Sequence, residues 1–135
     1  MRVVLDTNVL VSGLLTPLGR SGDIVRLLTT DAIILCVDSR ILLEYQEVIR
    51  RPRFNIVPHK ADIIIDYIQA SAEIYAGIPL KKALPDPDDN PFLEVALSSS
   101  AECLVTGNVK HFPVRYRAGI RVLSPAEFLD FFTKH

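Results

Sequence analysis

The chain alternates between short apolar runs and segments whose apolar residues recur every three to four positions. The runs are rich in Val, Ile and Leu, which is typical of buried strands, and the segments between them have the period of an amphipathic helix. Strands that alternate with helices imply a mainly parallel sheet covered on both faces. We therefore expect an α/β fold, a three-layer α/β/α sandwich with a mainly parallel central sheet.

Local signals place the boundaries of the predicted elements. Asp38 or Ser39 is expected to cap a helix that ends before Pro52, and Ser124 with Glu127 forms a capping-box pattern. The predicted strands are 2–5, 33–37, 102–106 and 121–123, with 76–80 as a short edge strand. The predicted helices are 8–15, 22–30, 40–50, 60–75, 91–99, a short turn at 109–112 and a final helix from Ser124.

Length and composition limit the class of protein. A chain of 135 residues suits one domain, 1–135, and 49% hydrophobic residues can form a substantial core. The net charge of -1 argues against binding to duplex DNA through the overall field of the protein. Cys36 and Cys103 lie in apolar runs and are expected to be buried thiols in a reducing compartment. The sequence shows no signal peptide and no run long enough to span a membrane, so we expect a cytoplasmic protein.

An acidic residue follows the first predicted strand directly. Asp6 comes after the apolar run Val3-Val4-Leu5, and in open α/β sheets ligands bind at the carboxyl ends of the strands. Burying a carboxylate there is costly unless it is paired, hydrogen-bonded or bound to a metal. A functional role for Asp6 is therefore favoured over a role limited to bonding loop amides.

Two further acidic positions are expected near Asp6. Glu44 lies among apolar residues on a predicted helix, and Asp89 lies at the start of another, after Asp86 and Asp88. Gathered carboxylates repel unless a cation neutralises them, and Mg²⁺ or Mn²⁺ prefers such oxygen ligands. Other interpretations stay open: Glu44 as a solvated helix residue, Asp89 as a helix cap, and Asp86 and Asp88 as turn residues.

Five segments of the chain form a pattern when they are taken in order. They are Val-Val-Leu-Asp-Thr-Asn-Val-Leu-Val-Ser at 3–12, Ile-Leu-Leu-Glu-Tyr-Gln-Glu-Val-Ile-Arg-Arg-Pro-Arg-Phe at 41–54, Asp-Pro-Asp-Asp-Asn-Pro-Phe-Leu-Glu-Val-Ala at 86–96, Cys-Leu-Val-Thr-Gly-Asn-Val-Lys-His-Phe at 103–112, and Val-Leu-Ser-Pro-Ala-Glu-Phe-Leu at 122–129. These segments, in the same order, resemble the PIN-domain family, and in particular its VapC-like group of toxin components of toxin–antitoxin systems. The resemblance implies Mg²⁺- or Mn²⁺-dependent cleavage of single-stranded RNA. Under it, Asp6, Glu44 and Asp89 match the first three acids of the family, and Asp86 lies close enough to assist.

The chain departs from the family pattern at Asn108, where many PIN domains carry an aspartate. An asparagine offers a carbonyl oxygen but no charge, so the resemblance implies three carboxylates and one tightly held metal rather than two. Thr106 and Asn8 are expected to orient the acids together with Asn108, although Asn8 could equally cap a helix.

Basic and aromatic residues offer possible contacts for RNA. Arg and Lys cluster at 50–53, at 81–82 and between 110 and 121, with Phe54 and Tyr116 nearby, although a solvated surface is the simpler interpretation. The family resemblance also implies a homodimer and an antitoxin protein that binds across the acidic groove.

Three functions follow from these observations. The leading one is a metal-dependent endoribonuclease, the toxin of a toxin–antitoxin pair. The alternative is a PIN-like RNA- or protein-binding module whose catalysis has weakened at Asn108. A phosphatase-like hydrolase is disfavoured, because Asn8 stands where the commonest aspartate-nucleophile phosphatases would need a second aspartate.

Overall fold

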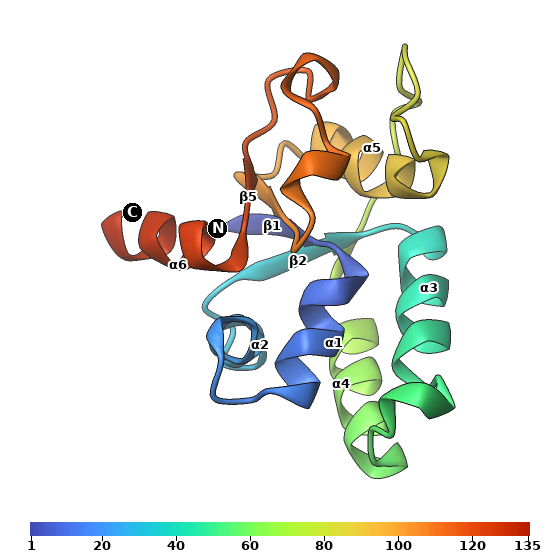
Figure 1. Ribbon diagram of the computed structural model, residues 1–135, viewed down its shortest axis with the longest axis vertical. Coiled ribbons are helices and arrows are strands. Elements are labelled where there is room, and N and C mark those ends of the chain that lie inside the picture. The colour runs from blue at the N-terminus through green and yellow to red at the C-terminus, as the bar shows by residue number, and fades with distance from the viewer.

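Five short parallel strands form the centre of the molecule, in the order β3-β2-β1-β4-β5 (Figure 1). The computed structural model describes all residues, 1–135. The strand bounds are β1 Arg2–Leu5, β2 Ile34–Val37, β3 Glu73–Ile74, β4 Cys103–Val105 and β5 Val122–Leu123. The expected parallel sheet is confirmed, with β1 at its centre.

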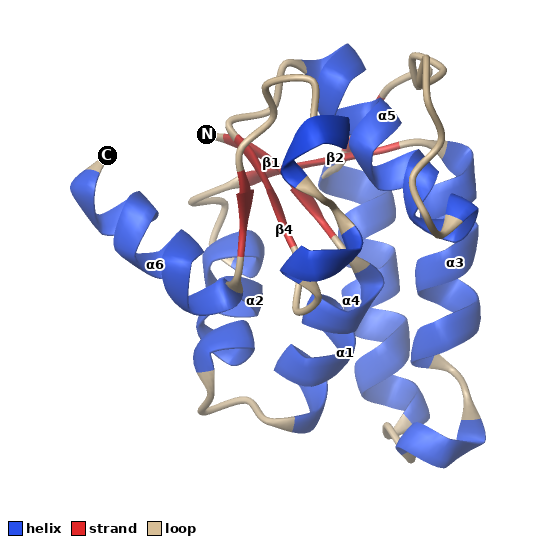
Figure 2. Cartoon of the chain, turned by 45° about the horizontal axis from the view of Figure 1, so that its top comes forward, coloured by secondary structure: helices blue, strands red, loops and turns tan.

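Helices cover both faces of this sheet, as expected for an α/β sandwich. Figures 1 and 2 place α5 on one side of the strands and α1, α2 and α4 on the other. The helix bounds are α1 Thr7–Leu15, α2 Arg20–Thr29, α3 Ser39–Ile49, α4 Pro58–Ser71, α5 Asn90–Ser99 and α6 Pro125–Lys134. Four 3-10 turns complete the chain: η1 Pro52–Phe54, η2 Pro87–Asp89, η3 Val109–His111 and η4 Val114–Tyr116.

The hydrophobic core forms because apolar residues of the strands face helices on both sides. Val3, Val4 and Leu5 of β1 are fully buried, and so are Leu104 and Val105 of the neighbouring β4. A strand buried on both faces has no need of alternating polar residues, which explains the continuous apolar runs in the sequence. One cluster of 31 buried residues includes contributions from all these layers.

Side-chain caps fix the starts of two helices. Asp38, not Ser39, caps α3: its Oδ1 accepts a 2.9 Å hydrogen bond from the Ile41 N–H. At α6 the predicted capping box is present, with the Glu127 N–H donating to Ser124 Oγ and the Ser124 N–H donating to Glu127 Oε1. These caps satisfy donors that the helix itself leaves unpaired.

The predicted edge strand at 76–80 is wrong, and the predicted helix 60–75 extends too far. The helix α4 ends at Ser71, and Glu73–Ile74 pairs with β2 instead. The Tyr75 N–H donates to the Val37 carbonyl at 2.8 Å, and Arg2 forms an ion pair with Glu73. The free edge of β2 thus supplies backbone partners that outweigh the helical spacing of the local sequence.

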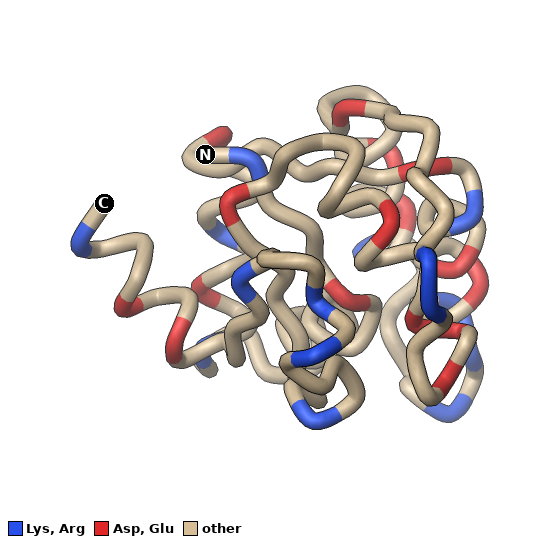
Figure 3. Tube along the Cα trace, turned by 90° about the horizontal axis from the view of Figure 1, so that it is seen from above, with Lys and Arg blue, Asp and Glu red and all other residues tan.

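The expectation that the two cysteines are buried thiols is confirmed. Cys36 and Cys103 are buried and free. Figure 3 shows both acidic and basic positions on the trace, in keeping with the net charge of -1. None of the helices has the length and apolar character needed to cross a membrane.

Candidate functional site

The tip of β1 carries the most deeply buried acid of the predicted set. Asp6 is 7% exposed, and its N–H is held by the Val105 carbonyl at the tip of β4. Thr106, the next residue of that tip, donates a 2.7 Å hydrogen bond from Oγ1 to Asp6 Oδ2. Burial raises the pKa of Asp6, and the Thr106 bond partly offsets that rise. The sheet therefore holds Asp6 in one orientation.

Glu44 approaches the same place from α3, where it is half-buried. The Thr7 hydroxyl, next to Asp6 in the chain, donates a hydrogen bond to Glu44 Oε2. Burial raises the pKa of Glu44, and the negative charges of Asp6 and Asp88 raise it further. Glu44 is thus turned toward the other acids rather than toward open solvent. Sequence reasoning gave Thr7 no role, although a hydroxyl residue beside a buried acid was a usable signal.

Asp89 is the third acid of this group and lies where η2 meets α5. It makes no capping hydrogen bond, so the helix-cap interpretation of its side chain is wrong. Its Oδ2 atom is buried and has no hydrogen-bond partner, while His111 Nδ1 lies 3.4 Å away without hydrogen-bond geometry. Burial, followed by the charges of Asp6 and Asp86, raises the pKa of Asp89 to about 6.

Asp86 takes the turn role that the sequence left open. It is exposed, and its Oδ1 accepts a 3.0 Å hydrogen bond from the Asp88 N–H, which closes the η2 turn. Its charge still reaches the site, because it contributes to the raised pKa of Asp89. Asp86 therefore acts on the site through its charge, while its Oδ1 atom is engaged by the turn.

The polar residues around Asp6 connect the tips of β1 and β4. Asn8 Oδ1 accepts a 3.1 Å bond from the Gly107 N–H, and its Nδ2 lies 3.5 Å from Asp6 Oδ2. Asn8 is not a helix cap, because Asp6 occupies the cap position of α1. Asn108 is exposed, and its N–H donates to Thr106 Oγ1 at 3.0 Å. Asn8 and Thr106 thus orient the site, while Asn108 is fixed through its backbone.

Comparison with known proteins gives the family. The PIN domain matches residues 2–110, most of the chain. The chain belongs to the PIN-domain family. Over 145 aligned residues it is 27% identical to an uncharacterized protein, MJ1680, of Methanocaldococcus jannaschii, covering 99% of this chain and 93% of that protein.

A solved structure agrees with this fold. The chain is similar to one in the crystal structure of VapBC2 from Rickettsia felis bound to a DNA fragment from their promoter. The TM-score is 0.61 at 18% identity, and the match covers 92% of this chain and 98% of that one. At this identity the similarity concerns the fold alone.

The acids of this PIN domain suit a hard divalent cation. All three have raised pKa values, and one buried oxygen of Asp89 has no hydrogen-bond partner, so a cation would relieve the repulsion and bind that oxygen. No three of the His, Cys, Asp and Glu side chains are spaced to enclose an ion by themselves. Mg²⁺ needs no such enclosure, since it keeps several waters and takes one or two carboxylates together with substrate phosphates.

A groove beside Asp6 and Glu44 joins the acids to basic side chains. Its volume is about 440 Å³, and Arg51, Arg53 and Phe54 form the wall contributed by the η1 region. Arg53 lies over the Phe54 ring, 4.7 Å from its centroid, and Arg51 pairs with Glu47. The groove thus offers positive charge and an aromatic ring next to the acids.

A second buried acidic cluster was missed by sequence reasoning. Arg40 bridges Asp38 at 2.7 Å and Glu94 at 2.8 Å, and Glu94 also accepts the Leu80 N–H. These groups neutralise one another and join the start of α3 to α5. The cluster is therefore a structural clamp between α3, which carries Glu44, and α5, which begins directly after Asp89. The capping role of Asp38 was the only signal for it in the sequence.

Proposed function

We propose that this PIN domain is a metal-dependent endoribonuclease that cleaves single-stranded RNA and acts as the toxin of a toxin–antitoxin pair. The observation that carries the proposal is the gathering of Asp6, Glu44 and Asp89, with a buried Asp89 oxygen that makes no hydrogen bond and has the His111 ring 3.4 Å away. The carboxylates of such a set repel one another, and a divalent cation would relieve that repulsion and attract a substrate phosphate.

Each acid has a defined part in this proposal. Asp6 and Asp89 would hold Mg²⁺ or Mn²⁺, with Glu44 joining them directly or through water and Asp86 adding charge at the edge. The ion would supply Lewis acidity and positive charge at the scissile phosphodiester. Thr106 and Thr7 keep Asp6 and Glu44 in place, so that the site is ordered before the substrate arrives.

The basic groove is the reason why we propose single-stranded rather than duplex RNA as the substrate. Arg51 and Arg53 would contact backbone phosphates, and Phe54 presents a ring on which an unpaired base can stack. The paired bases of a duplex are unavailable for such stacking. The two free, buried cysteines agree with the cytoplasmic location that this substrate requires.

Asp6→Asn tests the chemistry directly. The variant keeps the size of the side chain and removes its charge, so we expect Mn²⁺-dependent cleavage of a labelled single-stranded RNA to fall by at least about a hundredfold. Asp66→Asn is the matched control, because Asp66 is an exposed acid on α4. Cleavage that persists in the Asp6→Asn protein, or that survives a chelator, would refute the assignment.

A second candidate function rests on Asn108. This residue is exposed and uncharged at a position where an acid would complete the site, which favours a module that binds RNA or protein without cutting. Metal-dependent cleavage by the purified wild-type protein would rule this candidate out. Strand binding without cleavage at any metal concentration would support it.

The partner proposals follow from the same family assignment. An antitoxin would lay an extended or helical segment across the groove that holds Asp6 and Glu44, in competition with RNA. Co-purification from a tandem expression of the chain with the product of an adjacent small gene tests this. We further propose a homodimer, which light scattering of the purified chain would detect.

A further inference from the structure

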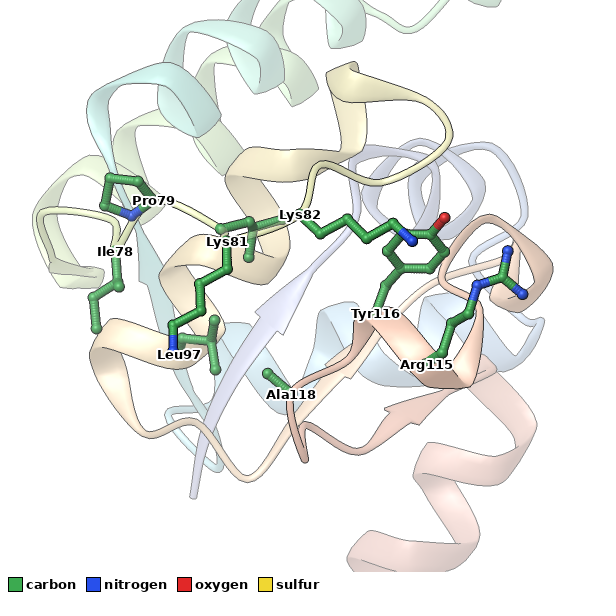
Figure 4. A pocket seen from close by; sticks show the side chains of 9 residues that line it. Ile78, Pro79, Lys81, Lys82, Leu97, Arg115, Tyr116 and Ala118 are labelled. Atoms are coloured by element: carbon green, nitrogen blue, oxygen red, sulfur yellow. The ribbon is translucent and has the colours of Figure 1, made fainter.

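A second basic pocket lies apart from the groove beside Asp6. It has a volume of about 330 Å³ and opens between the loop 78–82, the end of α5 and the η4 turn. Figure 4 shows Lys82 extending across to the Tyr116 ring, with Arg115 beside that ring and Lys81 following another wall. Ile78 and Leu97 are among the apolar lining residues. The pocket thus combines three cations, one aromatic ring and apolar surface.

The cations of this pocket are not neutralised by the protein. No carboxylate lines it, and none of Lys81, Lys82 and Arg115 forms an ion pair with an acid anywhere in the chain. Lys82 Nζ and Arg115 Cζ instead lie 5.0 and 4.9 Å from the centroid of the Tyr116 ring. Arg50, by contrast, is paired with Asp62. Two cations facing one aromatic ring leave a net positive site for an anion.

The aromatic ring is itself altered by this setting. Contact with Arg115, together with the charge of Lys82, lowers the pKa of Tyr116. The ring is half-buried against the core, which fixes its position, and it lines the pocket. A fixed ring flanked by cations is the combination that single-stranded nucleic acid binders use, with a base on the ring and phosphates on the cations.

Both walls of the pocket are anchored to residues that neighbour Asp89 or its contact His111. On one side the Leu84 N–H, two residues after Lys82, donates to Oδ1 of Asn90 at 2.9 Å. On the other side Arg117, next to Tyr116, donates to the Phe112 carbonyl at 2.6 Å, and the preceding His111 contacts Asp89. The segments that form the pocket thus lead toward Asp89, whereas the Arg51–Phe54 groove is lined by Asp6 and Glu44 themselves.

We infer that the pocket formed by Lys81, Lys82, Arg115 and Tyr116 binds a flanking nucleotide of the single-stranded RNA whose scissile phosphate lies at Asp6, Glu44 and Asp89. This inference rests on the proposed ribonuclease function for the identity of the strand. One nucleotide stacks its base on Tyr116, and its phosphates contact Lys82 and Arg115. The strand then passes the acids toward Arg53 and Phe54, so the two basic surfaces hold it on both sides of the cut.

Strand binding without cleavage tests this subsite. Fluorescence anisotropy with a labelled single-stranded RNA of about twelve nucleotides, in chelator, measures affinity while the strand stays intact. We expect Tyr116→Leu to weaken binding on the order of tenfold and Tyr116→Phe to retain it, because the ring rather than the hydroxyl stacks. Lys82→Gln with Arg115→Gln should lower the slope of log affinity against log salt by roughly 1.4, or about 0.7 per phosphate contact.

Controls separate this site from general charge and from other ligands. Lys60→Gln removes an exposed lysine of α4 that has no ion pair, and it should leave the affinity and the salt slope unchanged. Thermal unfolding shows whether each variant is folded. Unlabelled RNA should displace the labelled strand far better than a free mononucleotide or polyglutamate does. Equal displacement by the mononucleotide would overturn the inference in favour of a free nucleotide site, and equal displacement by polyglutamate in favour of an acidic protein partner.

The remaining outcomes distinguish the subsite from the nuclease proposal. If the wild-type protein fails to cleave RNA with Mn²⁺ but loses strand affinity on Tyr116→Leu, the nuclease proposal fails and the subsite stands. If the wild type cleaves and the Tyr116 and Lys82–Arg115 variants bind as it does, the subsite alone is wrong. A wild-type protein that binds no strand in chelator also overturns the subsite.

Discussion

Thr106 at the tip of β4 donates a 2.7 Å hydrogen bond to Asp6 Oδ2 at the tip of β1, across 100 positions of sequence. Thr106 is fully buried, so water does not compete for this bond. The same hydroxyl accepts the Asn108 N–H at 3.0 Å. One threonine therefore fixes the buried acid and the loop after β4 together, and it favours the ionised form of Asp6.

Replacing Thr106 by valine should weaken the site while keeping its shape. The bond to Asp6 is lost, the pKa of Asp6 rises further, and we expect affinity for Mn²⁺ to fall by about ten- to a hundredfold. Isothermal titration with Mn²⁺ measures this. Thr106→Ser restores the hydroxyl and should restore most of the affinity. Equal binding by the valine and serine variants would show that the hydrogen bond has no part in holding the metal.

The pKa of Asp89, raised to about 6, predicts an unusual dependence of stability on pH. The unfolded value is about 4, so the folded state holds its proton more tightly. The stability that this proton contributes is present below about pH 4 and is lost as the pH rises through about 6. Metal-free Asp89→Asn should therefore unfold at a higher urea concentration than wild type at about pH 7.5. Its free energy of unfolding should be higher by on the order of 1–3 kcal/mol.

That difference should shrink as the pH falls toward 5, because wild-type Asp89 then also carries no charge. Asp66→Asn, which removes an exposed acid, should show no such trend. Mn²⁺ should stabilise wild type above about pH 6 and progressively less below it, since protons compete for the same oxygens. A wild-type protein as stable as Asp89→Asn both at about pH 7.5 and at about pH 5 would contradict the destabilising burial and repulsion ascribed to the Asp89 charge.

The fold could be predicted from the sequence because its signals are local. Apolar runs mark β1, β2 and β4, and the caps at Asp38 and Ser124 mark helix starts. The strand β3 could not, because Glu73–Ile74 becomes a strand only through the open edge of β2. Its sequence alone continues the helical spacing of α4, and the pairing partner lies far away in the chain.

The site shows the same division. Asp6 follows its strand directly, so its place at the sheet edge was predictable, and the family pattern selected Glu44 and Asp89. The Thr7–Glu44 bond and the contact of Arg40 with Glu94 depend on how α3 packs against α1 and α5. Packing angles of that kind are set by side chains from several elements together, and no local pattern records them.

Restoring an acid at Asn108 predicts opposite effects with and without metal. Asn108→Asp adds a negative charge to the residue whose N–H bonds Thr106, the partner of Asp6, so the metal-free protein should lose on the order of 1 kcal/mol of stability, by urea unfolding, through repulsion. With Mn²⁺ the extra carboxylate should lower the metal concentration needed for half-maximal cleavage, several-fold. Asn55→Asp, on an exposed turn, is the matched control. Asn90→Asp is unsuitable, because the Asn90 side chain accepts a hydrogen bond from the Leu84 N–H. An unchanged metal requirement would place position 108 outside the metal site.

Arg40 holds two buried carboxylates, whereas Arg50 holds an exposed one, and the two arginines are otherwise alike. Their side chains are 50% and 47% exposed. The partners of Arg40, Asp38 and Glu94, are 8% and 12% exposed, while Asp62, the partner of Arg50, is 55% exposed. Removal of either arginine therefore takes away a similar half-exposed cation but leaves behind very different anions.

Arg40→Gln should destabilise the protein by about 3 kcal/mol, because it leaves two buried carboxylates without a cation, each with one backbone N–H as its remaining partner. Arg50→Gln should cost no more than about 1 kcal/mol, since water solvates the freed Asp62. Urea unfolding of both variants beside wild type measures the difference. Because Arg40 joins the start of α3 to α5, its loss should also weaken Mn²⁺ binding, through the displacement of Glu44 relative to Asp89. Equal losses of stability in the two variants would show that burial of Asp38 and Glu94 does not decide the strength of the clamp.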